Sequence, residues 1–233
     1  MRDADERRGA RSKQVLVNNG VYVYGAGGHS LVVMDVLRDL GVPVLGVYAD
    51  EGRRHPKHGS VLPGVRITGA EAFDNLTAPF VMCIGRNSER AEIVAALHRA
   101  VFFTAIHSEA LIAPTATIGE GTVVLHRAVI QANTHIGRHV LINTAASVDH
   151  DNIIGDFAHI SPHATLCGHV EVGEGTHIGA GAVITPSVKV GKWTTVGAGA
   201  VVIRDVPDGV TVVGNPARVV PNRTGQQLPN GEY

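Results

Sequence analysis

The sequence has few aromatic residues and almost no cysteine. Phenylalanine, tyrosine and tryptophan make up 4% of its 233 residues, and there are two cysteines. Two cysteines, Cys83 and Cys167, cannot form a disulfide framework, and each lies in an apolar context typical of a small buried side chain. Aromatic side chains are too scarce to fill a wide globular core, so the composition favours a narrow, repetitive architecture.

No charge of one sign dominates, since the formal net charge is −1. Balanced charge argues against a nucleic-acid partner, because phosphate backbones select basic proteins. No apolar run reaches the ~18–20 residues that a membrane span needs. Residues 1–14 are too charged for a signal peptide. We therefore expect a cytoplasmic protein without a membrane span, preceded by a loose leader over residues 1–19.

Glycine is abundant, with 28 residues, and it accompanies a long repeat. Every sixth residue from Ile112 to Val202 is Ile, Val or Leu, at sixteen consecutive positions without a slip. A period of six is neither helical nor a plain strand alternation, and it is typical of short strands joined by tight corners around a narrow prism. Three sides make a coil of eighteen residues, so the series spans about five coils, stacked roughly 4.8 Å apart.

Residues 20–106 follow a different pattern and predict a small Rossmann-like α/β domain. Strands are expected at 21–24, 42–48 and 80–85, and helices at 29–40 and 88–100. Strands that alternate with helices predict a parallel sheet.

The turn between the first strand and the first helix contains Gly25, Gly27 and Gly28. Such a turn brings backbone N–H groups and a helix N-terminus close to a phosphate, and Asp50 follows at a distance suited to a ribose or base. A purely structural turn is the alternative. Ser30 replaces the third glycine of the dinucleotide motif, and the unit is half of a full dinucleotide fold, which favours a single nucleotide over NAD.

An unusual cluster of polar residues, Asp149, His150 and Asp151, interrupts the repeat. With eighteen residues per coil, Gly168 lies one coil above His150 and Ala132 one coil below, so no bulky side chain covers the imidazole. His159 follows nine residues later, half a coil away, and therefore cannot share a stack with His150.

These residues resemble a known family. The repeat is similar to that of the hexapeptide-repeat acyltransferases, and YGAGGHSLVVMDVL, IGRNSERAEI, NTAASVDHD and GNPAR resemble the NeuD/PglD-type sugar acyltransferases over residues 20–218. The resemblance implies a left-handed parallel β-helix and a homotrimer with active sites between subunits. It also implies that the N-terminal domain holds a nucleotide-linked amino-sugar. Members carry two acids where this chain has Ala49 and Asp50, which leaves the base and sugar open.

The implied chemistry is acyl transfer from a thioester to an amine. An imidazole accepts a proton near neutrality, so His150 is the candidate base, and Asp151 orients it and raises its basicity. The N–H of Gly168 is the candidate donor to the tetrahedral oxyanion. By resemblance, His159 contacts the acetyl group of acetyl-CoA. The remaining expected coenzyme contacts are Gly179, Ala180, Gly197, Ala198, Arg204 and Arg218. The expected substrate contacts are Gly27, Gly28, His29, Asp50, Gly85 and Asn87, and no metal is expected.

The sequence thus predicts a leader (1–19), a nucleotide-sugar domain (20–106), a β-helix (107–213) and a C-terminal loop and tail (214–233). The predicted function is N-acetylation of a nucleotide-linked 4-amino-4,6-dideoxysugar by direct transfer from acetyl-CoA. An O-acetyltransferase and a non-catalytic assembly module are alternatives. A zinc enzyme similar to gamma-class carbonic anhydrases is more distant, because its histidine pair spaced by five is missing. The nucleotide, the sugar stereochemistry and the length of the acyl group stay open.

Overall fold

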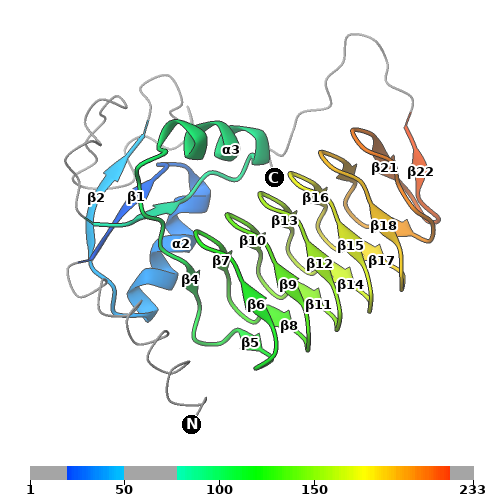
Figure 1. The fold of residues 1–233 in the computed structure, drawn as a ribbon, viewed down its shortest axis with the longest axis horizontal. Coiled ribbons are helices and arrows are strands. Elements are labelled where there is room, and N and C mark those ends of the chain that lie inside the picture. The colour runs from blue at the N-terminus through cyan, green and yellow to red at the C-terminus, as the bar shows by residue number, and fades with distance from the viewer. Residues whose placement is uncertain (1–19, 50–77, 221–233) are drawn as a thin grey trace.

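The computed structural model describes residues 20–49 and 78–220 (Figure 1). The predicted leader, most of the C-terminal tail and Asp50 lie outside the described residues. No helix in these two described stretches is both long and apolar enough to cross a membrane.

The N-terminal domain contains the predicted parallel sheet, and its three strands lie in the order β2-β1-β3. The strands are β1 (Val21–Tyr24), β2 (Val44–Tyr48) and β3 (Phe80–Met82), and the helices are α2 (Gly28–Asp39) and α3 (Asn87–Ala96). β2 begins two residues later than predicted, after Pro43, which has no N–H for the ladder. α3 ends at Ala96 instead of residue 100, because Leu97 leaves the helical conformation and is buried.

The two helices of this domain cover opposite faces of the sheet. Val33, Val36 and Leu37 of α2 share a core with Val21 and Val23, and this core continues into the first turns of the β-helix. α3 contributes Ile93 and Leu97 to a second core that contains the aromatic side chains of the sheet. The N-terminal domain is therefore joined to the prism by apolar packing.

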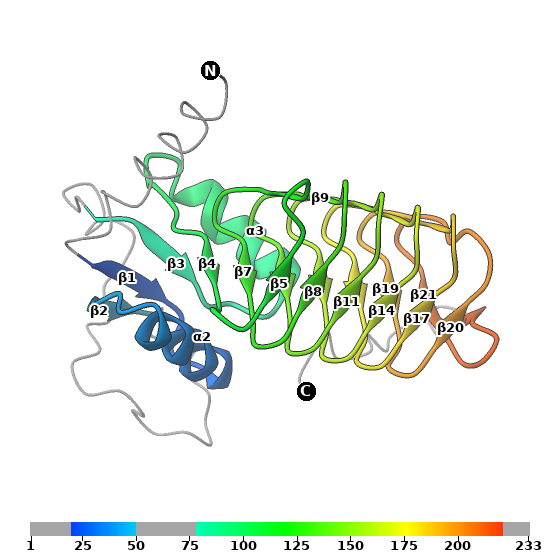
Figure 2. The ribbon, with the colours of Figure 1, turned by 90° about the horizontal axis from the view of Figure 1, so that it is seen from below.

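The C-terminal domain is a left-handed parallel β-helix whose turns follow one another along the prism (Figures 1 and 2). From Ala105 to Ile184 each strand pairs with the strand eighteen residues later, as in Ser147↔Thr165, so the predicted coil length is confirmed. We call its three faces the first, second and third sheets. The first contains β4 (Ala105–Ile106), β7 (Val123–Val124), β10 (Leu141–Ile142), β13 (His159–Ile160), β16 (His177–Ile178), β19 (Thr195–Val196), β21 (Thr211–Val213) and β22 (Arg218–Val219). The second contains β5 (Leu111–Ile112), β8 (Val129–Ile130), β11 (Ser147–Val148), β14 (Thr165–Leu166), β17 (Val183–Ile184) and β20 (Val201–Val202). The third contains β6 (Thr117–Ile118), β9 (His135–Ile136), β12 (Ile153–Ile154), β15 (Glu171–Val172) and β18 (Lys189–Val190).

The repeat begins and ends differently from the predicted series. Its first strand, β4, ends at Ile106, six residues before Ile112, so the prism starts one side earlier than the series used for the prediction. After β20 the spacing shortens, because Val212 pairs with Val196, and β22 then runs antiparallel to β21. The aliphatic residues of the series form one continuous buried core along the prism.

The corners between strands share one backbone conformation. Along much of the β-helix, one corner residue in every six has a positive φ, either a glycine or another residue, such as Asn133, Asp151, His163 and His169. Glycine, asparagine and aspartate tolerate this left-handed conformation best. Side chains at equivalent corners of successive turns lie in columns, and one of these columns carries the candidate site.

A buried arginine docks α3 against the first sheet. Arg90 is 0% exposed, and its guanidinium donates to the carbonyl oxygens of His139 (2.9 Å) and Phe157 (2.7 Å) in successive turns. It also donates to Asn87 Oδ1 (3.0 Å), whose amide nitrogen donates to Gly175 O (3.0 Å) in the following turn. Arg90 and Asn87 thus bind three successive turns of the prism to the N-terminal domain.

Candidate active site

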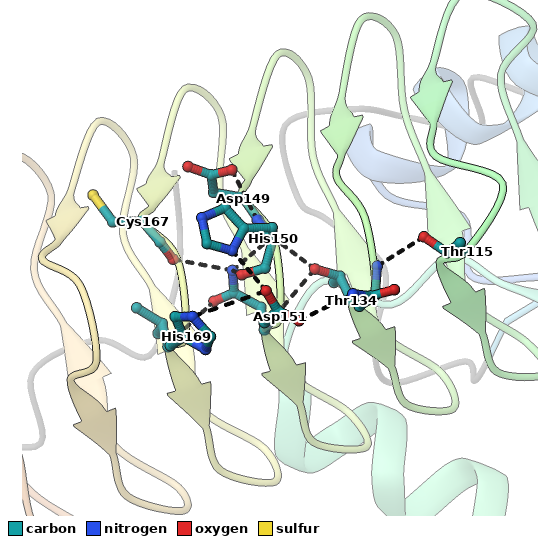
Figure 3. A network of polar contacts seen from close by, with 10 residues as sticks. Thr115, Thr134, Asp149, His150, Asp151, Cys167 and His169 are labelled. Atoms are coloured by element: carbon teal, nitrogen blue, oxygen red, sulfur yellow. Dashed lines mark hydrogen bonds and ion pairs between the residues drawn. The ribbon is translucent and has the colours of Figure 1, made fainter.

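His150 lies at the corner that follows β11, between the second and third sheets, and its side chain is 50% exposed (Figure 3). Its Nδ1 lies 2.7 Å from Asp151 Oδ2, so the predicted imidazole–carboxylate pair is formed within one corner. The backbone N–H of His150 also donates to Asp149 Oδ1 at 2.8 Å. Asp151 therefore holds the ring of His150, and Asp149 holds its backbone.

The carboxylate of Asp151 is held in place by the turn below. Asn133, one coil earlier, donates from Nδ2 to Asp151 Oδ1 at 3.2 Å, and Asp151 itself has the left-handed φ of 56°. The hydrogen bond to Asp151 raises the pKa of His150, and the charge of Asp149 adds to it. The same hydrogen bond, followed by that from Asn133, lowers the pKa of Asp151. The pair is suited to an imidazole whose Nε2 accepts a proton while Asp151 stabilises the resulting cation.

Gly168 lies beside the imidazole, as the coil length predicted. A Cβ atom built on Gly168 would lie 2.6 Å from Cε1 and 2.7 Å from Nε2 of His150, so the ring occupies the space that the missing side chain leaves. Within residues 20–49 and 78–220, the Gly168 N–H has no hydrogen-bond partner. This N–H is therefore available to a ligand close to His150 Nε2.

Gly168→Ala is expected to displace the His150 ring and lower acyl transfer by about 10²-fold, because a misplacement of ~1 Å at the reacting group costs that much. The protein should remain folded, since the clash is with a half-exposed side chain and Gly168 needs no left-handed φ. Rates measured for Gly168→Ala, His150→Asn and the double variant test this. The second substitution should cost little once the first is present, and an unchanged rate in Gly168→Ala would contradict the prediction.

His159 occupies a different side of the prism from His150. It lies on β13 in the first sheet, with Leu141 and His177 as its neighbours in the adjacent turns, as predicted. Its Nε2 lies 3.1 Å from Asn143 Nδ2, and its ring stacks on that of His177 with centroids 4.9 Å apart. Burial, followed by the nearby imidazole of His177 and the charge of Arg90, holds the pKa of His159 well below its ordinary value.

The expected coenzyme residues form a second edge, where the first and second sheets meet. Gly179–Ala180 follows β16, and Gly197–Ala198 follows β19 one turn later. A Cβ atom on Gly179 would lie 2.6 Å from Ala198 N, so these turns lie in close contact. Arg204, in the loop after β20, and Arg218, on β22, are both exposed at the C-terminal end of the prism. The structure places this edge next to His159 but on a different side from His150.

The glycine turn of the N-terminal domain has the predicted strand–turn–helix form. Gly27 is the N-cap of α2, and among the described residues other than the chain neighbours and the helix's own backbone, no atom lies within 4 Å of a Cβ built on Gly27 or Gly28. Gly25 has a φ of 119° and approaches Cys83 O, so this position requires glycine. His29 Nε2 is buried without a hydrogen-bond partner among the described residues. Burial and the charge of Arg90 lower the pKa of His29 to about 4.

Two of the expected substrate residues lie where the domains meet. The Asn87 amide donates to carbonyl oxygens of the β-helix, and the Gly85 carbonyl accepts from Arg90 at 3.3 Å. Sequence reasoning did not single out Arg90, Asn143 or His169. His169 was detectable in principle, because it lies eighteen residues after Asp151.

Comparisons with known protein families agree with both halves of the fold. Residues 20–97 match the PglD N-terminal domain, and residues 153–186 and 169–204 match the family described as bacterial transferase hexapeptide (six repeats). A curated relative, the uncharacterised protein L142 of Acanthamoeba polyphaga mimivirus, is 30% identical over 119 residues, which are 50% of this chain. The matched segment is 23% of that protein, so the chain spans about a quarter of this relative.

Solved structures match nearly the whole chain. PerB from Caulobacter crescentus, solved with CoA and GDP-perosamine, is 34% identical, with a TM-score of 0.78 over 86% of this chain and 97% of that chain. The acetyltransferase domain of PglB from Neisseria gonorrhoeae FA1090 is 36% identical, with a TM-score of 0.77 over 87% and 100%. WeeI from Acinetobacter baumannii AYE is 30% identical, with a TM-score of 0.76 over 86% and 99%.

The β-helix, its small α/β domain and these matches define an acyltransferase built on hexapeptide repeats. The chain belongs to the NeuD/PglD-type hexapeptide-repeat acyltransferases. This membership decides against the carbonic anhydrase alternative and against a module that only assembles.

Proposed function

We propose that this protein transfers the acetyl group of acetyl-CoA to the amine of a nucleotide-linked 4-amino-4,6-dideoxysugar in the cytoplasm. The observation that carries the proposal is the His150–Asp151 pair, which is open to solvent and lies beside Gly168. The similar PerB was solved with CoA and GDP-perosamine, and the similar PglB domain with acetyl coenzyme A. An amino-sugar and a thioester are the two reactants that such a pair would join.

In the proposed reaction, the sugar amine attacks the thioester carbonyl carbon and forms the C–N bond. Nε2 of His150 accepts the proton that the amine loses, and Asp151 stabilises the imidazolium. The Gly168 N–H donates to the oxyanion of the tetrahedral intermediate. The intermediate collapses as the C–S bond breaks, and the thiolate of CoA leaves and takes up a proton. No acyl-enzyme is needed, because the amine itself is the nucleophile.

The two edges of the prism support a site shared between copies of the chain. His150 lies where the second and third sheets meet, whereas His159, Gly179 and Gly197 lie near the edge of the first and second sheets. The outward side chains of the second sheet are small or apolar from Leu111 to Val201, with Leu111 66% exposed. We infer a homotrimer in which the second sheets face each other, so that His150 of one prism meets the coenzyme edge of its neighbour.

The N-terminal domain supplies the proposed nucleotide site. The open turn at Gly27 and Gly28 and the N-terminus of α2 suit a phosphate, and the buried, unpartnered His29 Nε2 suits a polar atom of the substrate. Gly85 lies just before α3, and Asn87 is the first residue of that helix. Asp50 is retained as a candidate contact to the ribose or base, and Arg204 and Arg218 as candidate contacts to the phosphates of CoA.

The proposal is tested by incubating the protein with acetyl-CoA and a panel of GDP-, UDP- and dTDP-linked 4-amino-sugars, together with their 4-hydroxy analogues. Release of free thiol and formation of the N-acetyl product are expected with an amine of one nucleotide class. Thiol release only with hydroxy analogues would establish an O-acetyltransferase instead. No release with any acceptor would contradict acetyl transfer to this substrate class.

A further inference from the structure

We propose that the corner carrying His150 also binds a divalent cation of the Zn²⁺ type, held by His150, Asp151 and His169, and that this cation blocks acyl transfer. One ligand atom from each of the three residues lies within 4.8 Å of the others, and no other such group of three occurs within residues 20–49 and 78–220. Binding of the cation follows from this geometry alone, whereas the block rests on the proposed function.

The backbone places the three side chains together. Asp151 and His169 occupy equivalent corners of successive turns, with φ values of 56° and 60°. The N–H of His169 donates to the carbonyl oxygen of His150 at 3.0 Å, which fixes one turn against the next. In Figure 3, dashed lines connect the Asp151 carboxylate to both imidazoles. The spacing of the ligands is therefore a property of the rigid β-helix.

One oxygen of Asp151 faces both imidazoles. Oδ1 accepts from Asn133, whereas Oδ2 lies 2.7 Å from His150 Nδ1 and 3.9 Å from His169 Nε2. Zn²⁺ binds imidazole nitrogen and carboxylate oxygen at ~2.0–2.2 Å, so tetrahedral ligands lie ~3.3 Å apart. The two observed separations lie on either side of that value, and small side-chain rotations would reach it. The His169 side chain is 63% exposed, which leaves room for water at the remaining coordination position.

The ligand set selects the kind of cation. Two imidazoles and one carboxylate suit Zn²⁺ and neighbouring transition metals, whereas Mg²⁺ and Ca²⁺ prefer ligand sets made only of oxygen. We therefore expect Zn²⁺ to bind and Mg²⁺ not to compete.

The bound cation would remove the base. When Nδ1 of the neutral His150 ring binds the cation, the proton that Nδ1 shared with Asp151 moves through solvent to Nε2. Nε2 then has no lone pair for the proton of the amine, and the Asp151 oxygen is occupied by the metal. Acyl transfer would stop without any change in the fold, and a chelator would restore it.

Calorimetric titration of the chelator-treated, dialysed protein with ZnCl₂ tests the binding. The wild-type protein should bind one Zn²⁺ per chain, and His169→Asn should bind it at least ~10-fold more weakly. Asparagine is compatible with this corner, since Asn133 adopts the same left-handed conformation at the equivalent corner one coil before Asp151. His98→Asn is the matched control, because His98 is also an exposed histidine but lies in the N-terminal domain after the end of α3, outside both edges of the prism that carry expected site residues. No Zn²⁺ binding by the wild type, or equal binding by His169→Asn, would overturn the site.

A chromatographic assay of the acetylated product tests the block, since Zn²⁺ also binds the free thiol of CoA. Added Zn²⁺ should stop product formation by the wild type and by His98→Asn, and a chelator should restore it. His169→Asn should keep its metal-free rate in the presence of the same Zn²⁺. Zn²⁺ that binds without lowering the rate would refute the block. If the metal-free protein forms no product, the proposed function fails, while the titration still decides the metal site.

Discussion

His150→Asn is expected to lower kcat for acyl transfer by about 10²- to 10⁴-fold, the contribution typical of a positioned general base. Asparagine is polar and similar in reach, but its amide cannot accept a proton. The fold should be unchanged, because the ring is half exposed and lies beside Asp151 and Gly168. Coenzyme binding should also persist, since the expected coenzyme residues lie on the other edge. Steady-state kinetics with a saturating amine acceptor measure the loss.

His98→Asn is again the matched control for this substitution, because it removes an exposed histidine that lies in the N-terminal domain, after the end of α3. Its kcat should equal that of the wild type. A His150→Asn variant that keeps more than about a tenth of the wild-type kcat would remove His150 from the role of base.

Arg90→Met is expected to lower the free energy of unfolding by about 3–5 kcal/mol, because several buried carbonyl oxygens lose their donor at about 1–3 kcal/mol each. Methionine fills much of the same volume but donates no hydrogen bond. The carbonyl oxygens of Ile84, His139 and Phe157 would then be left buried without the guanidinium. Burial lowers the pKa of Arg90 to about 9, because the protein interior solvates the charge less well than water does. Urea unfolding followed by circular dichroism measures the loss.

Arg90→Lys separates charge from geometry in the same experiment. Lysine keeps a positive charge, but it lacks the planar fork that reaches carbonyl groups in two turns of the prism, so an intermediate loss of stability is expected. A loss below about 1 kcal/mol for Arg90→Met would show that apolar packing alone holds the N-terminal domain on the β-helix.

The period of six carried most of what the sequence revealed. It predicted the β-helix and the coil of eighteen residues, and through that coil it placed Gly168 beside His150 and His177 beside His159. These predictions succeed because a β-helix repeats one local geometry, so sequence distance translates directly into spatial distance. The N-terminal strands and helices were also predicted, with errors of a few residues. β2 begins only after Pro43, β3 already ends at Met82, and α3 ends before Leu97.

The sequence did not predict the contacts between the domains or the particular side-chain contacts within the prism. Arg90 appears there as an ordinary charged residue of a helix, and only the docked fold shows that carbonyl groups from two turns surround it. The bond between Asn143 and His159 spans sixteen residues, and it depends on which way each side chain leaves its corner. Corner conformation is likewise a property of the wound chain, and it decides that His169 faces Asp151.

The most direct measurement is a crystal structure of the protein with CoA and its nucleotide amino-sugar. The sugar amine should lie within about 3 Å of His150 Nε2, the distance that proton transfer requires. The coenzyme thiol should lie beside it, between that corner and the His159 edge of a neighbouring copy. A coenzyme bound far from His150, or an imidazole closed off from both ligands by the neighbouring copy, would contradict the account.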